Sequence, residues 1–382
     1  MKKAVPAENG IYRYPVSRPS LPDLGGMREE MASLWKTGRL ASGDRVRALE
    51  EAVAKKIGVE HAVAVSSCTS GLVLAGQALG ITGEVIVPAF ASARTAHAVT
   101  WNRATPVFCD SEPGTYTLDC RKIEKRITRK TTAIMPVSVF AVPPRVADFE
   151  AFARTHRLRL LFDSSHAFGA KVNGTCVGCF GDVEVFSLGT GAVVTAIQGG
   201  VATTNDGIIA KRIRQMRDHG KADDGEDMAF VGLSAGMSEL HAAVGLANFL
   251  RMEELIRHRG ELVSRYRERL SGLPGLAFQE IPDAVTPSHN CMVVFVDGTG
   301  GVTRDDLRDT LRAQGIQTKR SFHPAVHRMT AYRLWSRRFP GKLTVAETAS
   351  RASLALPLYG ELSTEDVDHI CARVREAFSH IP

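Results

Sequence analysis

Two kinds of hydrophobic pattern divide the chain. Up to about residue 250, short apolar segments alternate with segments in which apolar side chains recur at helical spacing, as in residues 46–57, 72–79 and 146–155. This alternation is typical of parallel strands whose connecting helices cover both faces of a sheet. The predicted strands are residues 61–65, 84–87, 105–109, 132–137, 158–162, 182–187 and 200–204. The pattern therefore predicts an α/β fold with a mostly parallel sheet.

From Met237 onwards the pattern becomes one of long helices with a single clear strand. Helical spacing covers about residues 237–273 and returns twice near the C-terminus, where Ser363 is a plausible N-cap. The remaining elements are a strand at 291–296 and helices at 304–313 and 363–378. We therefore predict an N-terminal extension, a large α/β domain and a smaller α+β domain. Their predicted bounds are 1–14, 15–250 and 251–382.

Composition narrows the class of protein without naming a ligand. The 382 residues are 44% hydrophobic and 23% charged, as in ordinary globular proteins. No apolar stretch approaches the ~20 residues of a membrane span, and the N-terminus lacks the apolar core of a signal peptide. Seven scattered cysteines indicate reduced thiols and a cytoplasmic location. The net charge of +7 favours anionic ligands. Its dispersion argues against nucleic acid as a partner.

Three segments follow predicted strands, where open parallel sheets bind ligands. Residues 66–71 place small hydroxyl side chains before a helix, an arrangement that suits a phosphate or serves as an ordinary N-cap. Residues 186–200 are rich in glycine and hydroxyls and could form a second anion-binding turn, although they lack a Walker lysine.

The cysteine pair Cys176 and Cys179 is not one of these three segments. It forms a lone C-x-x-C motif, which we interpret as two incidental thiols.

Asp163 and His166 form the third candidate. Asp163 ends an apolar strand, so its carboxylate either caps the next turn or holds a cationic partner such as a protonated pyridine nitrogen. A metal site is not predicted, because no further ligands accompany these two residues.

Taken together, these motifs give the chain a strong family likeness. From about Leu21 to Ile381 it resembles the sugar aminotransferases of the DegT/DnrJ/EryC1/StrS family. Pro324, His327 and Tyr332 stand in family positions. The matching stretches are residues 65–72, 85–110, 163–170, 181–200, 236–247, 315–332 and 356–358. The resemblance implies the type I fold of aspartate aminotransferase and the cofactor pyridoxal 5′-phosphate (PLP) or its amine form, pyridoxamine phosphate (PMP).

The resemblance also implies roles for individual residues. Asp163 would pair with the pyridine nitrogen, and His166 would lie beside the ring hydroxyl. Ser234 matches a residue that reaches the phosphate of a neighbouring subunit, which implies a homodimer with shared sites. The remaining expected cofactor contacts are Cys68, Thr69, Ser70, Ser92 and Ser187.

Position 192 departs from the family pattern. The family's Schiff-base lysine follows Ser187 by five residues, and this chain has Ala192 there. Without an amine, the cofactor has no covalent anchor and no base for proton transfer. Because the other cofactor residues are retained, we interpret Ala192 as an engineered Lys→Ala change. The alternative is a natural variant that does other PLP chemistry or binds without turnover.

Substrate contacts also differ from the family. Ser92 replaces an aromatic residue, and Gly236 replaces a basic one. Lys319 and Arg320 are candidates for an anionic substrate group or for a solvated basic surface, and Phe322 is a further candidate contact. The acceptor could therefore be a nucleotide-linked keto sugar or a smaller ketone such as a keto-cyclitol.

The sequence thus predicts a PLP-dependent aminotransferase that moves an amino group from glutamate or glutamine to a keto group on a sugar or related ring. The expected pathway is antibiotic or surface-glycan biosynthesis. The chain as written is expected to be inactive because of Ala192. Two alternatives remain: a PLP- or PMP-dependent sugar dehydratase, and a non-catalytic family member that acts as a partner subunit or ligand binder.

Overall fold

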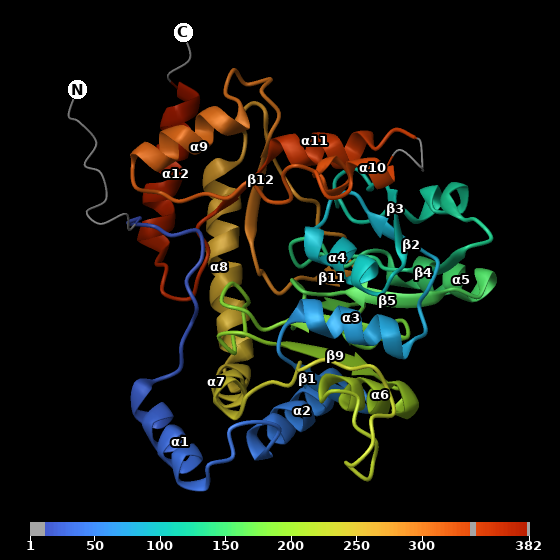
Figure 1. Cartoon of the computed structure of the whole chain (residues 1–382). Helices are drawn as coiled ribbons and strands as arrows, with labels where there is room; N and C mark the ends of the chain where they lie inside the picture. The colour runs from blue at the N-terminus through green and yellow to red at the C-terminus, as the bar shows by residue number, and fades with distance from the viewer. Residues whose placement is uncertain (1–11, 337–340, 380–382) are drawn as a thin grey trace.

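A seven-stranded sheet forms the centre of the molecule in a computed structural model that describes residues 12–336 and 341–379 (Figure 1). Its order is β1-β9-β8-β5-β4-β2-β3; β9 is antiparallel to both neighbours, and the other four pairs are parallel. The strands are β1 (His61–Val65), β2 (Glu84–Pro88), β3 (Thr105–Cys109), β4 (Thr131–Ile134), β5 (Arg159–Asp163), β8 (Val183–Ser187) and β9 (Gly200–Thr204). The predicted α/β fold with a mostly parallel sheet is confirmed. Residues 1–11 of the predicted extension lie outside the described residues.

Helices cover both faces of this sheet because successive strand residues point to opposite sides. In β2, Val85 and Val87 contribute to the core under one layer of helices, whereas Ile86 contributes to the core on the other face. The first layer consists of α3 (Cys68–Ala78), α4 (Ala93–Trp101) and α6 (Gly207–Arg217). The second consists of α2 (Asp44–Ile57), α5 (Val146–His156) and α7 (Glu239–Leu250).

Helix α3 begins earlier than predicted, at Cys68 rather than at residue 72. The Ser67 hydroxyl accepts a hydrogen bond from the backbone N–H of Ser70 (3.0 Å), and the Ser70 hydroxyl accepts one from the N–H of Ser67 (3.0 Å). This capping box satisfies two free donors at the start of the helix. A side chain at Gly200 would place its Cβ 2.7 Å from the Cys68 nitrogen. Glycine therefore allows β9 to lie directly against the N-terminus of α3.

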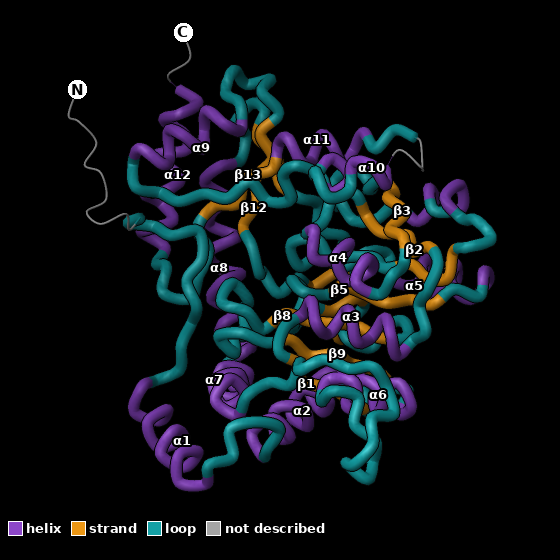
Figure 2. The backbone as a smooth tube through the Cα atoms, in the orientation of Figure 1, coloured by secondary structure: helices purple, strands orange, loops and turns teal. Residues whose placement is uncertain are grey.

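A second, antiparallel sheet forms the core of the C-terminal part, at the upper left of Figure 2. Its strands are β10 (Leu276–Phe278), β12 (Met292–Val296) and β13 (Ser353–Leu356). Three helices share its core: α8 (Met252–Leu270), α9 (Arg304–Ala313) and α12 (Thr364–Ser379). The helical region predicted at 237–273 is two helices, α7 and α8, divided at Arg251. As predicted, Ser363 caps the last helix, where its hydroxyl accepts from the N–H of Asp366 (3.1 Å).

The division between the two parts is not sequential at either end of the described chain. Tyr14 lies in the core of the C-terminal part and exchanges backbone hydrogen bonds with Gly315 and Gln317. Conversely, Tyr332 and Leu343 pack into the core of the large sheet. Two helices lie in this returning segment: α10 (Arg333–Ser336) and α11 (Thr344–Ala352).

Smaller elements complete the fold. Helix α1 (Leu24–Thr37) packs on α7, and a three-stranded sheet joins the hairpin β6–β7 to a distant strand. Its strands are β6 (Lys171–Val172), β7 (Thr175–Cys176) and β11 (Val285–Thr286).

The C-x-x-C thiols lie at this hairpin, each near a carbonyl oxygen at the end of α2. All seven cysteines are free thiols. Among the described residues, no helix has the length and apolar composition that a membrane crossing requires.

Glu184 is a buried carboxylate in β8, only 1% exposed. It accepts hydrogen bonds from the Ser164 hydroxyl (2.5 Å) and from the N–H groups of Gly178 (2.7 Å) and Phe180 (2.9 Å). Burial outweighs these bonds and raises the pKa of Glu184 to about 7, from 4.5 in the unfolded chain. Between these two pH values the folded state binds more protons than the unfolded state, so this group lowers the stability as the pH rises.

We therefore expect Glu184→Gln to gain stability relative to the unaltered chain as the pH rises from 5 to 8, by up to about 3 kcal/mol. Glutamine retains an acceptor for the two N–H groups and adds a donor for Ser164. The measurement is the free energy of unfolding in urea at both pH values, with the exposed Glu226→Gln as control. A difference between variant and unaltered chain that is the same at both pH values would contradict the prediction.

Candidate active site

One cavity brings most of the predicted site residues together. The carboxyl ends of β1, β5 and β8 meet at one sheet edge, and the antiparallel β9 begins at that same edge. There, a cavity of about 490 Å³ opens between this edge and segments of the C-terminal part. The predicted residues that line it are Cys68, Ser92, Asp163, His166, Ser187, Ala192, Lys319, Arg320 and Phe322.

Asp163 is the buried acid of this cavity, 2% exposed at the end of β5. One carboxylate oxygen accepts a hydrogen bond from the Thr95 hydroxyl (2.6 Å), and the other accepts one from the N–H of Ser165 (3.1 Å). No cation lies within ion-pair distance of it in the described part of the chain. Thr95 is not among the predicted site residues: it lies within the matching stretch 85–110, but its contact with Asp163, 68 residues away, is formed only by the fold. The carboxylate is thus oriented, buried and open to a cationic partner.

His166 lies beside this acid with a neutral ring. Burial lowers the pKa of His166 to about 4 despite the opposing effect of Asp163, and the positive charges of Lys319 and Arg94 lower it further. Its ring lies nearly parallel to that of Phe322, with 6.0 Å between the centroids. Its Nδ1 atom is buried and has no hydrogen-bond partner. A buried ring nitrogen without a partner is suited to a ligand that offers a polar group.

Cys68, at the start of α3, lines the cavity, whereas Thr69 and Ser70 are not among the lining residues. The Ser70 hydroxyl is engaged within the turn before α3, where it donates to the Ser67 carbonyl (2.8 Å). The N-cap that the sequence allowed is therefore present. A role in binding phosphate is compatible with it, because the remaining free N–H groups and the helix dipole still favour an anion.

Ala192 lies on the loop between β8 and β9 and lines the cavity. The loop is held at several points: the Ala192 N–H donates to the Gly189 carbonyl (2.9 Å) and the Val193 N–H to the Asn290 side chain (3.2 Å). Asn248 donates to the Thr195 carbonyl (2.8 Å). Among the residues that line the described cavity, Lys319 carries the one amine side chain. Position 192 is thus well ordered and directed at the site, yet it has no reactive group.

Like Thr69 and Ser70, the predicted residue Ser234 is not among the residues that line this chain's cavity. It forms an isolated bridge with Asp218, beyond the end of α6. The predicted contact of Ser234 with the phosphate of a neighbouring subunit stays a prediction.

The sheet order and this cavity define an α/β protein with a cavity at the carboxyl edge of its central sheet. The model of the DegT/DnrJ/EryC1/StrS aminotransferase family matches residues 26–375, and the chain belongs to that family.

Individual relatives agree with this assignment. The chain is 32% identical over 355 residues to the dTDP-4-amino-4,6-dideoxy-D-glucose transaminase of Escherichia coli, covering 92% of this chain and 95% of that protein. The crystal structure of DesI in the presence of its TDP-sugar product is similar with a TM-score of 0.91 and 33% identity, over 96% and 93% of the two chains. The crystal structure of S. venezuelae DesV in complex with a ketimine intermediate is similar with a TM-score of 0.88 and 28% identity, over 96% of this chain and 100% of that chain. The predicted fold type is therefore confirmed.

Proposed function

We propose that this chain is a sugar aminotransferase of the PLP-dependent kind, with the cofactor seated in the cavity at the sheet edge. The observation that carries the proposal is the buried carboxylate of Asp163, oriented by Thr95 and left without a cation. A protonated pyridine nitrogen supplies that cation. The unpartnered Nδ1 of His166 fits a ring hydroxyl. The predicted phosphate contacts are Thr69, Ser70 and Ser187, and Cys68 and Ser92 are further predicted cofactor contacts.

When bound, PLP supplies an aldehyde, or PMP an amine, on a ring that withdraws electrons. The residues of the chain have separate tasks. Asp163 holds the proton on the ring nitrogen, and Thr95 with the N–H of Ser165 keeps its carboxylate in place. An amine at position 192 would carry a proton between the two reacting carbons. Ala192 lacks that amine, so the proposed reaction requires a lysine there.

The proposed acceptor is a keto group on a sugar, in a nucleotide-linked sugar or a related ring such as a cyclitol. The names of the relatives support the nucleotide-linked form, since they specify a dTDP-linked amino sugar and a TDP-sugar product. The proposed amino donor is glutamate or glutamine, and the proposed setting is antibiotic or surface-glycan biosynthesis in the cytoplasm. We further propose a homodimer with Ser234 reaching the neighbouring site.

Position 192 favours a second candidate function. We interpret Ala192 as a Lys→Ala replacement in an otherwise intact site. If alanine is instead the native residue, the observation supports a non-catalytic family member that acts as a partner subunit or ligand binder. A dehydratase would need another base, for which His166 is the predicted residue.

Asp163→Asn tests the cofactor site in the chain as it stands. Amide nitrogen or oxygen would replace a carboxylate that pairs with a cation, and such charged hydrogen bonds contribute about 1.5–3 kcal/mol. We therefore expect PMP to bind about tenfold to a hundredfold more weakly, measured by equilibrium dialysis or fluorescence titration. The exposed Asp283→Asn serves as control and should bind PMP normally. Unchanged affinity in the Asp163 variant would place the cofactor elsewhere and reject the proposal.

A further inference from the structure

Two cations in the cavity have no described role in holding the cofactor. Arg94 lies in the first turn of α4, and Lys319 lies in the C-terminal part, where its backbone pairs with Ala355. Both side chains line the cavity. Throughout residues 12–336 and 341–379, no carboxylate lies within ion-pair distance of either one.

The place of Arg94 is electrostatically unfavourable in the protein alone. The N-terminus of a helix is positive, and acidic side chains are the ones it stabilises. Helix α4 has no acidic residue in its first turn; its cap is the hydroxyl of Ser92, which accepts from the N–H of Arg94 (3.3 Å). A guanidinium at this end is therefore repelled by the helix. An anion held between them would reverse that balance.

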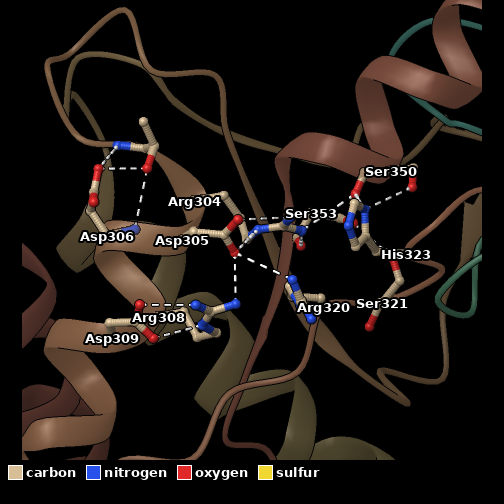
Figure 3. A network of polar contacts seen from close by, with 11 residues as sticks. Arg304, Asp305, Asp306, Arg308, Asp309, Arg320, Ser321, His323, Ser350 and Ser353 are labelled. Atoms are coloured by element: carbon tan, nitrogen blue, oxygen red, sulfur yellow. Dashed lines mark hydrogen bonds and ion pairs between the residues drawn. The ribbon is translucent and has the colours of Figure 1, made fainter.

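Arg320, the other cation of the cavity, differs from this pair. Its guanidinium lies 3.8 Å from Asp305, which also binds Arg304 and Arg308 (Figure 3). This network turns Arg320 toward α9 and supplies an opposing charge. Arg94 and Lys319 have no ion-pair partner among the described residues, and they belong to different parts of the molecule, Arg94 to α4 and Lys319 to the segment that pairs with Ala355.

His166 lines the same cavity as Arg94 and Lys319, so both charges act on its ring. Both positive charges lower the pKa of His166, and Arg94 also lowers that of Cys68, which is raised overall by burial. The pair is distinct from the turn before α3, because Arg94 belongs to α4 and Lys319 to the C-terminal part. A ligand that reached both would bridge the two parts of the molecule.

We propose that Arg94 and Lys319 together bind one anionic group of the substrate, a carboxylate or a phosphate, separate from the phosphate of the cofactor. The guanidinium would contact two oxygens through its planar fork, and the ammonium would act as a point charge. That the ligand is a substrate rests on the proposed function; that the pair binds an anion does not.

Calorimetric titration of the unaltered chain, saturated with PMP, tests the pair with two probes. The probes are 2-oxoglutarate, a dicarboxylate, and dTDP, a diphosphate. We expect Arg94→Gln and Lys319→Gln each to weaken one probe by about tenfold, and the double variant to lose less than the sum of the two effects. Loss of 2-oxoglutarate alone identifies a donor carboxylate as the ligand, and loss of dTDP alone identifies a nucleotide phosphate.

Matched variants separate this role from a structural one. Arg129→Gln removes an exposed arginine outside the cavity and should bind both probes normally. Arg94→Lys keeps the charge but not the fork, so intermediate affinity is expected. PMP binding by Arg94→Gln should persist, which distinguishes failure of the pair from failure of the cofactor site. If PMP does not bind, the same titrations are made without it. Equal affinities in all variants, or no binding of either probe to the unaltered chain, would overturn the proposal.

Discussion

Replacing Ala192 by lysine is expected to convert this chain into an active aminotransferase. Position 192 already lines the cavity, and hydrogen bonds from Ala192 and Val193 hold its loop. A lysine there would point into a site whose acid, Asp163, is in place. A positioned proton-transfer group contributes about 10²–10⁴ in rate, so we expect at least a hundredfold gain in amino transfer over the unaltered chain.

Two readouts report this change. The first is a visible absorbance band when the lysine variant takes up PLP, because the amine then forms a Schiff base with the aldehyde. The second is amino transfer from glutamate or glutamine to a keto sugar. Ala192→Met, of similar length but without an amine, is the control and should show neither.

The possible failures of this experiment are informative. An absorbance band without transfer from any donor would reject the aminotransferase assignment. Loss of a hydroxyl from a deoxy-keto sugar would identify the dehydratase instead. A lysine variant that retains no PLP after purification would favour the non-catalytic partner subunit or ligand binder.

Glu50→Ala is expected to lower the free energy of unfolding substantially. Glu50 on α2 is 8% exposed, and its carboxylate accepts from the N–H of Ala64 (2.8 Å) and pairs with Arg217. Arg217 also donates to the Ala64 carbonyl, and Arg214 donates to that of Ala62 (3.1 Å). These side chains therefore satisfy the outer groups of β1, the edge strand of the large sheet.

Removing the carboxylate leaves the largely buried guanidinium of Arg217 without an opposing charge and the N–H of Ala64 without a partner. Breaking such a pair costs about 3–5 kcal/mol. It also uncovers a sheet edge that other chains could pair with. Urea unfolding should show this loss for Glu50→Ala and a change within about 0.5 kcal/mol for Glu51→Ala, its exposed neighbour on the same helix. A loss below 1 kcal/mol in Glu50→Ala would show that the edge has other protection.

Local patterns were sufficient to predict the strands of the large sheet, the strand at 291–296 and most helices, but not β13 or the shorter strands. The strands at 61–65, 105–109 and 200–204 have the predicted bounds. The break at Arg251 was missed, since helical spacing continues on both sides of it. The position of Tyr14 in the distant core was also missed, because it depends on contacts with Gly315 and Gln317.

The site residues show the same difference between what local sequence indicates and what depends on distant contacts. Asp163 and Ser187 could be found from sequence because each ends an apolar strand, and strand ends are where such sheets bind ligands. Thr95, Arg94 and Asn290 could not. Arg94 and Thr95 lie within the matching stretch 85–110, but their places at the cavity and beside Asp163, like that of Asn290, depend on how segments far apart in the chain are brought together.

The single antiparallel strand of the large sheet has a consequence for evolution and design. Because β9 runs back beside β8, Ser187 and Gly200 face each other as a pair, and residues 188–199 leave and rejoin the sheet at one point. Residues 188–199, which include position 192 and so decide whether the site has a reactive amine, therefore form a loop whose two ends are adjacent. A substitution at position 192 within it leaves the pairing of Ser187 with Gly200, and so the register of β8 on β9, unchanged. Catalysis can be gained or lost in such a scaffold while the cofactor contacts outside the loop stay as they are.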